Sequence, residues 1–265
     1  LGNQVQIETD DVHTRARIKN IKKEKILNEL NNGNIVIIAG CQGVNNNNDI
    51  TTLGRGGSDT SAVAVAAAIG ADLCEIYTDV DGVYTTDPNI CPNAKKLKEV
   101  SFDEMLEMAS LGAKVLQIRS VEMAKKHNVK LCVRSTFSKD QGTFIVQNKD
   151  MEKKVITSIT CDKKQARITL RKVPDEVGIQ EKIFTPISNA NIIIDVIVQN
   201  VSTDGYLDIS FTVNRDDYNA SIRELNKYKD EIKFKELFCE TDVSKVSVIG
   251  VGMVSQSGIA TKMFE

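Results

Sequence analysis

The sequence has few of the features that build metal centres, membrane spans or nucleic-acid surfaces. It contains two histidines, and its six cysteines never form a CxxC pair, which argues against a Cys/His zinc site. No apolar run approaches the roughly 18 residues that cross a bilayer, and there is no signal peptide. Lysine plus arginine (34) nearly balances aspartate plus glutamate (36), unlike the basic footprint of a nucleic-acid binder. We therefore expect a protein of the reducing cytoplasm, without nucleic-acid or membrane partners.

The first half of the chain does contain a regular alternation of strand-like and helix-like segments. Residues 34–39 and 73–77 are short continuous apolar runs, typical of strands buried on both faces. Helical patterns cover three longer segments, residues 18–30, 58–68 and 115–126. Ser101 and Glu104 form a capping box at the start of a further helix. This alternation predicts an α/β layered domain with a mainly parallel sheet.

The second half repeats itself. Residues 178–184 (GIQEKIF) return as residues 258–264 (GIATKMF), and each copy follows a strand-like run. Tandem copies of a small βαββαβ-like unit explain this pattern, with the second copy truncated. The predicted domains are residues 1–148, a charged linker at 149–154, and residues 155–265, with a first unit at about 162–240 and a second at about 241–265 plus a strand at 155–160. Because the chain lacks an initiator Met and stops within a helical pattern, we expect a fragment.

The densest candidate site is the run TTLGRGGSD at residues 51–59. Three glycines allow the main chain to approach a ligand closely, and the N–H groups at the following helix start form an anion cradle. The guanidinium of Arg55 suits a carboxylate or phosphate, and Asp59 suits a helix cap or a substrate ammonium group. The alternative is a tight turn with a capping aspartate and a surface arginine. The run matches neither a P-loop nor a Rossmann fingerprint.

Two further segments suit a nucleotide. The run TDVDGVYTTDP at residues 78–88 begins at the end of a predicted strand, where ligands bind in open α/β sheets. Its Thr78, Asp79 and Tyr84 suit the ribose and base of an adenosine, and a plain hairpin without a ligand is the alternative. Lys114 comes two residues after Gly112, beside a predicted apolar helix, and suits a polyphosphate, with a snorkelling surface lysine as the alternative.

Taken together, these segments resemble the aspartate kinases of the amino-acid kinase superfamily, over essentially the whole chain and in the family's order. The motifs that carry the resemblance are HTRARI (13–18), AGCQG (39–43), the runs at 51–59 and 78–88, GAKVL (112–116), RSVE (119–122) and VQNVS (198–202). The resemblance implies an amino-acid-kinase-like three-layer sandwich followed by α+β ACT (ferredoxin-like) domains. It also implies an enzyme that uses MgATP to phosphorylate the side-chain carboxylate of L-aspartate, giving 4-phospho-L-aspartate on the route to lysine, threonine and methionine.

The resemblance also implies roles for individual residues. Arg55 binds the α-carboxylate of the substrate and Asp59 its ammonium group, and these two are the candidate catalytic residues. The remaining substrate-binding candidates are Gly56, Gly57 and Ser58. The ATP-binding candidates are Thr78, Asp79, Val83, Tyr84, Thr85, Thr86, Asp87, Pro88 and Lys114. No protein metal site is implied, because Mg²⁺ is carried by ATP.

Two departures from the family pattern affect the expected activity. The Lys-Phe-Gly-Gly-Thr segment, whose lysine neutralises the transferring phosphoryl group, is absent from these residues. Asn89 stands where many members place an arginine, which puts one nucleotide contact in doubt. We therefore expect the full-length protein to be a kinase and these 265 residues alone to be inactive.

The ACT resemblance implies regulation. Such domains bind amino acids at paired-domain interfaces, so we expect feedback by lysine, threonine or both and a homodimer formed through the ACT domains. The candidate effector residues are Asp175, Val177, Gly178, Ile179, Gln199 and Asn200. An ordinary helix cap is the alternative for the loop that contains the first four of them.

Two other functions compete with this one. Another kinase of the same superfamily would keep the glycine run but would not be expected to carry the ACT-like repeat. A non-catalytic amino-acid-binding regulatory subunit would have no use for a nucleotide segment. The repeat therefore argues against the first, and residues 78–88 argue against the second.

Overall fold

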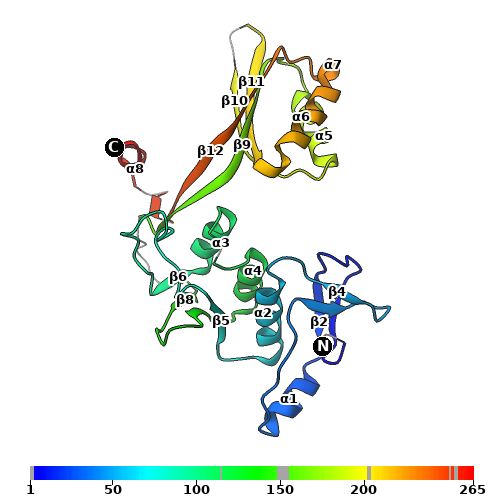
Figure 1. Ribbon diagram of the computed structural model, residues 1–265, viewed down its shortest axis with the longest axis vertical. Helices are drawn as coiled ribbons and strands as arrows, with labels where there is room; N and C mark the ends of the chain where they lie inside the picture. Colours follow the sequence, from blue (N-terminus) through cyan, green and yellow to red (C-terminus); the bar gives the residue numbers. More distant parts are fainter. Residues whose placement is uncertain (1–2, 114, 148–154, 202–203, 251, 254–255) are drawn as a thin grey trace. The chain divides into compact units, whose positions relative to one another are not determined.

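The computed structural model describes residues 3–113, 115–147, 155–201, 204–250, 252–253 and 256–265 (Figure 1). The chain divides into two compact units, residues 1–160 with 247–265 and residues 161–246. Each unit has a hydrophobic core of its own. Among the described residues, no helix has both the length and the apolar character of a membrane span.

The first unit contains two mixed four-stranded sheets. Its strands are β1 (Ile7–Thr9), β2 (Ile18–Ile21), β3 (Gln42–Val44), β4 (Ile50–Thr52), β5 (Cys74–Thr78), β6 (Glu99–Ser101), β7 (Leu131–Ser135) and β8 (Thr143–Val146). The first sheet has the order β2-β1-β3-β4, with β1 and β3 parallel and the other two pairs antiparallel. The second has the order β5-β7-β8-β6, where two parallel pairs flank the antiparallel pair β7/β8.

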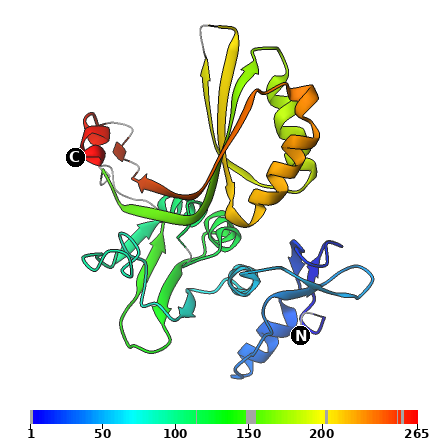
Figure 2. The same ribbon diagram turned by 45° about the horizontal axis from the view of Figure 1, so that its top comes forward.

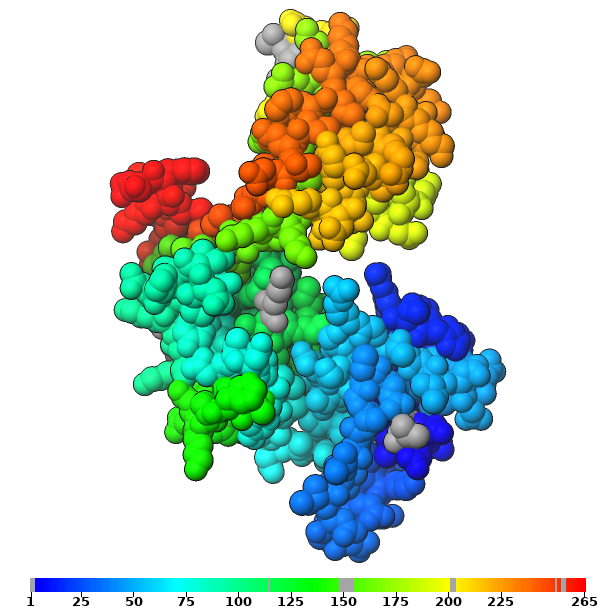
Figure 3. Space-filling view, in the orientation of Figure 1, coloured from blue at the N-terminus to red at the C-terminus, as the bar shows by residue number. Residues whose placement is uncertain are grey.

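Five helices accompany these sheets in the described part of the unit. They are α1 (Glu24–Asn31), α2 (Gly57–Ile69), α3 (Phe102–Ser110), α4 (Ile118–His127) and α8 (Ile259–Phe264). Helix α2 is rich in alanine and valine because it lies against the second sheet, and Val63 is completely buried there together with Cys74 of β5. Burial raises the pKa of the Cys74 thiol to about 11, so this thiol acts as a small apolar side chain. Helix α8 buries no side chain and lies at the surface (Figure 3).

The predicted capping box at the start of α3 is confirmed. The Ser101 hydroxyl accepts from the main-chain N–H of Glu104 at 3.2 Å. The Glu104 carboxylate in return accepts from the N–H of Ser101 at 3.1 Å and from its hydroxyl at 2.7 Å. The reciprocal bonds satisfy N–H groups that have no partner within the helix, which fixes where α3 begins.

Two predicted elements are wrong. Residues 34–39 form no strand: Ile35 and Ile37 are more than 90% exposed, while Val36 and Ile38 pack against a small cluster around Ile7. An apolar run becomes a two-sided buried strand only where neighbours cover both faces, and here only one face is covered. The predicted helix at 18–30 is instead strand β2 followed by the shorter helix α1. The spacing of three positions between apolar residues is compatible both with one long helix and with a strand followed by a helix.

The second unit is a four-stranded sheet covered by helices on one face (Figures 1 and 2). Its strands are β9 (Ser158–Pro174, which begins in the first unit), β10 (Ile194–Val201), β11 (Tyr206–Asn214) and β12 (Glu236–Ile249), and its helices are α5 (Ile179–Asn189), α6 (Tyr218–Lys227) and the short α7 (Lys229–Ile232). The order β10-β11-β9-β12 with the chain path β-α-β-β-α-β is ferredoxin-like. Ile183, Phe211 and Leu225 are buried between the sheet and the helices. The predicted combination of an α/β part and an α+β part is confirmed.

The internal repeat has the same local geometry in both copies. Gly178 precedes α5 with φ of 85°, and Gly258 precedes α8 with φ of 83°. A left-handed conformation of this kind favours glycine, which explains why both copies keep one at that position. Each copy follows a long strand, β9 or β12, as the sequence predicts.

The core of the second sheet in the first unit can be tested by a matched pair of leucine substitutions. Leu131 on β7 is completely buried, whereas Leu73 before β5 is 38% exposed. Leu131→Ala should lower the free energy of unfolding by about 2–5 kcal/mol because it leaves a cavity. Leu73→Ala should change it much less. Urea denaturation measures both, and equal losses would contradict the described core.

Candidate functional site

The glycine run forms a tightly packed loop in front of α2. Gly54 and Gly56 have φ of 85° and 71°, and α2 begins at the next residue, Gly57. A Cβ on Gly56 would lie 2.6 Å from Cγ of Gln117, and a Cβ on Gly57 would lie 2.7 Å from Cβ of Leu53. Real Cβ atoms essentially never make contacts this short, so space requires glycine at both positions, and at Gly56 the left-handed backbone favours it as well.

Arg55 and Asp59 lie on either side of this helix start. Arg55 is exposed and Asp59 is half-buried in the first turn of α2. Gly56 occupies the cap position, and no side chain caps the helix, so the alternative role of Asp59 as a helix cap is wrong. Burial raises the pKa of the Asp59 carboxyl, against the opposing hydrogen bonds from the Gln117 N–H and the Ser58 side chain. A carboxylate whose charge is incompletely compensated suits a cationic group of a ligand.

Arg119 holds the loop to a second segment. Its guanidinium donates to the carbonyl oxygen of Leu53 at 2.9 Å and to that of Ala16 at 2.8 Å. On the other side, the N–H of Leu53 donates to the carbonyl oxygen of Cys41 at 3.0 Å, and the Cys41 thiol lies 3.3 Å from the carbonyl oxygen of Gly54. The structure thus brings four motifs of the sequence together around one loop: residues 13–18, 39–43, 51–59 and 119–122.

The second candidate segment begins at the end of β5. Thr78, the last residue of β5, donates its hydroxyl hydrogen bond to the exposed carboxylate of Asp79 at 3.0 Å. The Tyr84 hydroxyl donates to the carboxylate of Asp81 at 2.9 Å. Lys96, which the sequence analysis missed, lies 3.3 Å from the same carboxylate and also pairs with Asp140. Its hydrogen bond to Asp140 lowers the pKa of that carboxyl. No local motif marked Lys96, because its partners come from distant parts of the chain.

Val83 belongs to the core rather than to the surface of this segment. Its side chain is completely buried, its N–H donates to the Thr143 hydroxyl at 2.9 Å, and its carbonyl oxygen accepts from Leu97 at 2.8 Å. Tyr84, Thr85 and Thr86, by contrast, are half-buried, and Asp87 and Pro88 are exposed. Val83 therefore anchors the segment, and its neighbours are the residues whose side chains stay at least partly accessible.

Asn89 has a visible structural partner. Both its N–H and its side-chain amide donate to the Asp87 carboxylate, at 2.8 and 3.0 Å. The pair forms an Asx-type turn that shapes the end of the segment. Lys114, the predicted phosphate ligand, lies outside the described residues.

The predicted effector residues also lie close together in the second unit. Asp175 and Val177 are exposed in the loop before α5, and the N–H of Asp175 donates to the carbonyl oxygen of Gly205 at 3.0 Å. Ile179 is buried in the core, so only its main chain is available to a ligand. The exposed Gln199 and Asn200 lie on β10. Gln180, not predicted, donates to the side chain of Gln199 at 3.0 Å and so ties the helix start to that strand.

Replacing Arg119 tests the arrangement of the loop. Leu53 and Ala16 are buried, so Arg119→Met leaves two carbonyl oxygens without the guanidinium. The expected loss in the free energy of unfolding is about 1–3 kcal/mol or more. Arg223→Met, at an exposed position of α6, is the matched control. Urea denaturation that gives equal values for the two variants would show that the two bonds do not stabilise the fold.

Comparison with known proteins agrees with this geometry. The sequence profile of the amino acid kinase family matches residues 2–135, and that of the ACT domain matches residues 171–228. An aspartate kinase of Pseudomonas fluorescens is 52% identical over 266 residues, covering 100% of this chain and 64% of that protein. The chain thus spans about two thirds of that relative's length.

Solved structures resemble the chain over nearly its whole length. The crystal structure of E. coli aspartokinase III with aspartate and ADP (R-state) has a TM-score of 0.77 and 26% identity, covering 98% of this chain and 59% of that one. The same enzyme with lysine and aspartate (T-state) has a TM-score of 0.72 and 28% identity, covering 93% and 56%. From the profile match over half of its residues, the chain belongs to the amino acid kinase family.

Proposed function

We propose that the protein containing this chain is an aspartate kinase. In the proposed reaction a side-chain carboxylate oxygen of L-aspartate attacks the γ-phosphorus of MgATP, the bond to the β,γ-bridging oxygen breaks, and 4-phospho-L-aspartate and ADP form. The observation that carries the proposal is the glycine loop with Arg55 and Asp59 at the start of α2, within motifs that match aspartate kinases over the whole chain. Catalysis of this kind depends on positioning and charge neutralisation rather than on covalent steps by the protein.

On the substrate side, Arg55 binds the α-carboxylate and Asp59 the ammonium group, with Gly56, Gly57 and Ser58 supplying the main-chain surface. The exposed guanidinium of Arg55 and the half-buried carboxylate of Asp59 support this division, because each offers the charge opposite to its proposed partner. Aspartate is present in both E. coli aspartokinase III structures that resemble the chain.

On the nucleotide side, ATP binds along residues 78–88. Thr78 and Asp79 receive the ribose, Tyr84 the base, and the main chain and side chains of Thr85 to Pro88 surround them. The exposure of this stretch and the anchoring of Val83 in the core support the assignment. Lys114 binds the phosphates of MgATP.

Regulation is assigned to the ferredoxin-like unit. We propose that lysine, threonine or both bind at the loop of Asp175, Val177 and Gly178, beside Gln199 and Asn200. The effector carboxylate then lies at the start of α5, an 11-residue helix whose N-terminal dipole favours anions. Lysine in the T-state relative supports an amino-acid effector.

The proposed assembly is a homodimer formed by the ACT domains, within the cytoplasm. The exposed apolar side chains of Val196, Ile197 and Val198 on the outer strand β10 support a partner on this sheet. All six cysteines are free thiols, as is usual in a reducing compartment. Residues 1–148 form the kinase part and residues 155–265 the regulatory part of the proposed protein.

The activity is tested by measuring ATP-dependent acyl phosphate formation, trapped as the hydroxamate, with L-aspartate as acceptor. The protein extended to the length of its relatives should turn over, and the 265-residue chain should not. Arg55→Met in the extended protein should raise KM for aspartate by about tenfold or more, since a charge-assisted bond contributes about 1.5–3 kcal/mol. Phosphorylation of a different acceptor, or aspartate turnover by the 265-residue chain, would contradict the proposal.

Asp59→Asn should weaken the binding of aspartate and, at pH 7, stabilise the fold. Because burial raises the pKa of Asp59, the folded protein holds this proton more tightly than the unfolded chain. The favourable contribution of Asp59 to the free energy of unfolding is therefore fully present below about pH 3.9, the ordinary aspartate pKa. It is lost as the pH rises from that value through the raised pKa of the folded protein. At pH 7 without substrate the Asn variant should be more stable than the parent, and the difference should shrink toward pH 3. KM for aspartate should rise in the same variant.

Thermal denaturation across that pH range, with Asp72→Asn at an exposed position as control, measures the effect. A parent protein that is more stable than Asp59→Asn at pH 7 would contradict it.

A further inference from the structure

The carbonyl oxygen of Thr85, in the middle of the nucleotide segment, accepts a hydrogen bond from a residue far away in the sequence. The main-chain N–H of Ile159 donates to it at 2.8 Å. Thr85 is otherwise tied to Lys95, through its N–H at 2.9 Å and through its hydroxyl oxygen at 3.0 Å. Because Tyr84 and Thr86 flank Thr85, any displacement of Thr85 moves both of them. The position of Ile159 therefore bears directly on the segment that is proposed to bind ATP.

Ile159 is held in turn by Thr157. The N–H of Thr157 donates to the carbonyl oxygen of Ile249 at 2.8 Å, and its hydroxyl donates to the carboxylate of Glu104. Thr157 is 8% exposed and Ile249 is 4% exposed, so water replaces a lost bond poorly here. Ile159 follows Thr157 by two residues, so the two hydrogen bonds made by Thr157 limit how far the Ile159 N–H can move.

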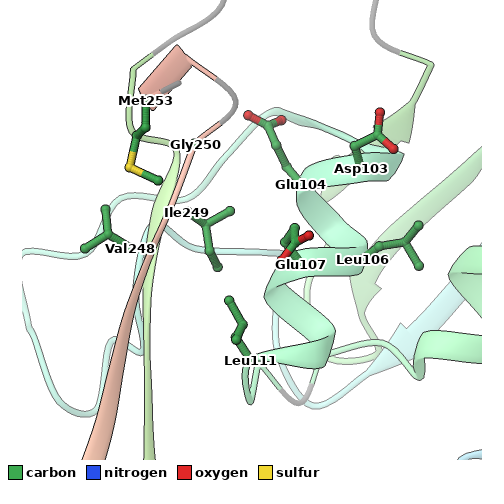
Figure 4. A pocket seen from close by; sticks show the side chains of 9 residues that line it. All are labelled: Asp103, Glu104, Leu106, Glu107, Leu111, Val248, Ile249, Gly250 and Met253. Carbon is green, nitrogen blue, oxygen red and sulfur yellow. The ribbon is translucent and has the colours of Figure 1, made fainter. Parts of the chain in front are cut away.

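Glu104 is itself immobilised. It is the carboxylate of the capping box on α3, where it accepts two hydrogen bonds from Ser101. Figure 4 shows Glu104 projecting from the first turn of α3 toward β12, where Ile249 and Gly250 border a cavity of about 460 Å³. A Cβ on Gly250 would lie 2.0 Å from the carbonyl oxygen of Val155, so the chain segments beside the ends of β12 and β9 approach closely at this point. The hydroxyl of Thr157 is therefore bound to a fixed acceptor.

We propose that Thr157 and Glu104 are positioning residues for ATP: together they fix the strand that holds the nucleotide segment at Thr85. The inference rests on the proposed function, because it assigns residues 78–88 to the nucleotide. Neither residue touches the nucleotide, and both act through the Ile159–Thr85 hydrogen bond. Glu104 and Thr157 thus support the proposed nucleotide site although both lie outside the motif at residues 78–88.

The test compares three variants of the extended protein in steady-state kinetics. Thr157→Val removes the hydroxyl at nearly constant volume and should raise KM for ATP about three- to tenfold, while kcat and KM for aspartate change less than twofold. Thr157→Ser keeps the hydroxyl and should restore the parent KM. Thr169→Val is the matched control: it loses one hydrogen bond further along the chain, on β9, to Ser210 at 2.9 Å, and should leave KM for ATP unchanged.

A second measurement needs no catalysis and separates this inference from the proposed function. In hydrogen–deuterium exchange on the 265-residue chain, the amide of Ile159 and those of residues 84–86 should exchange faster in Thr157→Val than in Thr169→Val. If Thr157→Val does not fold, Thr157→Ala replaces it in both measurements. Equal exchange in the two variants, or an ATP KM within twofold of the parent, would overturn the inference. Absence of aspartate phosphorylation by the extended parent protein would instead overturn the proposed function.

Discussion

The two hydrogen bonds donated by Arg119 are the interaction on which the candidate substrate site depends. They satisfy the buried carbonyl groups of both Leu53 and Ala16, and so reinforce the main-chain hydrogen bonds that join Ala16 to Thr52. The loop between Leu53 and Gly57 can then fold only with glycine at its contact points, because Gln117 and Leu53 occupy the space of any Cβ. Arg55 is left exposed at the top of this packed loop. A rigid support beneath an exposed cation is what selective binding of a carboxylate requires.

The sequence predicted well those features whose determinants lie within a few residues of each other. The capping box of Ser101 and Glu104 is an example, because its bonds span three residues and need no other part of the chain. The repeated left-handed glycines at Gly178 and Gly258 are another. The strand predicted at residues 34–39 is wrong for the opposite reason. Whether an apolar run is buried depends on what lies beside it, and here the side chains of Ile35 and Ile37 are left exposed.

The same distinction applies to the candidate site. Glycine-rich and acidic motifs marked where Arg55, Asp59 and Tyr84 lie, because loops that approach a ligand carry a local signature of glycine and polar residues. The groups that hold those loops have no such signature. Arg119 is 66 residues from Leu53 and 103 from Ala16, and Thr157 is 53 from Glu104. Only the folded chain brings them together, so the sequence could indicate candidate binding groups but not the bonds that support them.

These supports share a chemical feature that relates binding to regulation. The loops are held largely through main-chain groups, at the carbonyls of Leu53, Ala16 and Thr85. Main-chain anchors leave the loop side chains available for ligands, and they respond to displacement of the strand that supplies the donor. Strand β9 begins beside Thr85 and ends at Pro174, one residue before the proposed effector loop. In the proposed regulation, effector binding at that loop acts on the end of the same strand whose beginning is hydrogen-bonded to the proposed nucleotide segment, so β9 connects the two proposed sites through the chain itself.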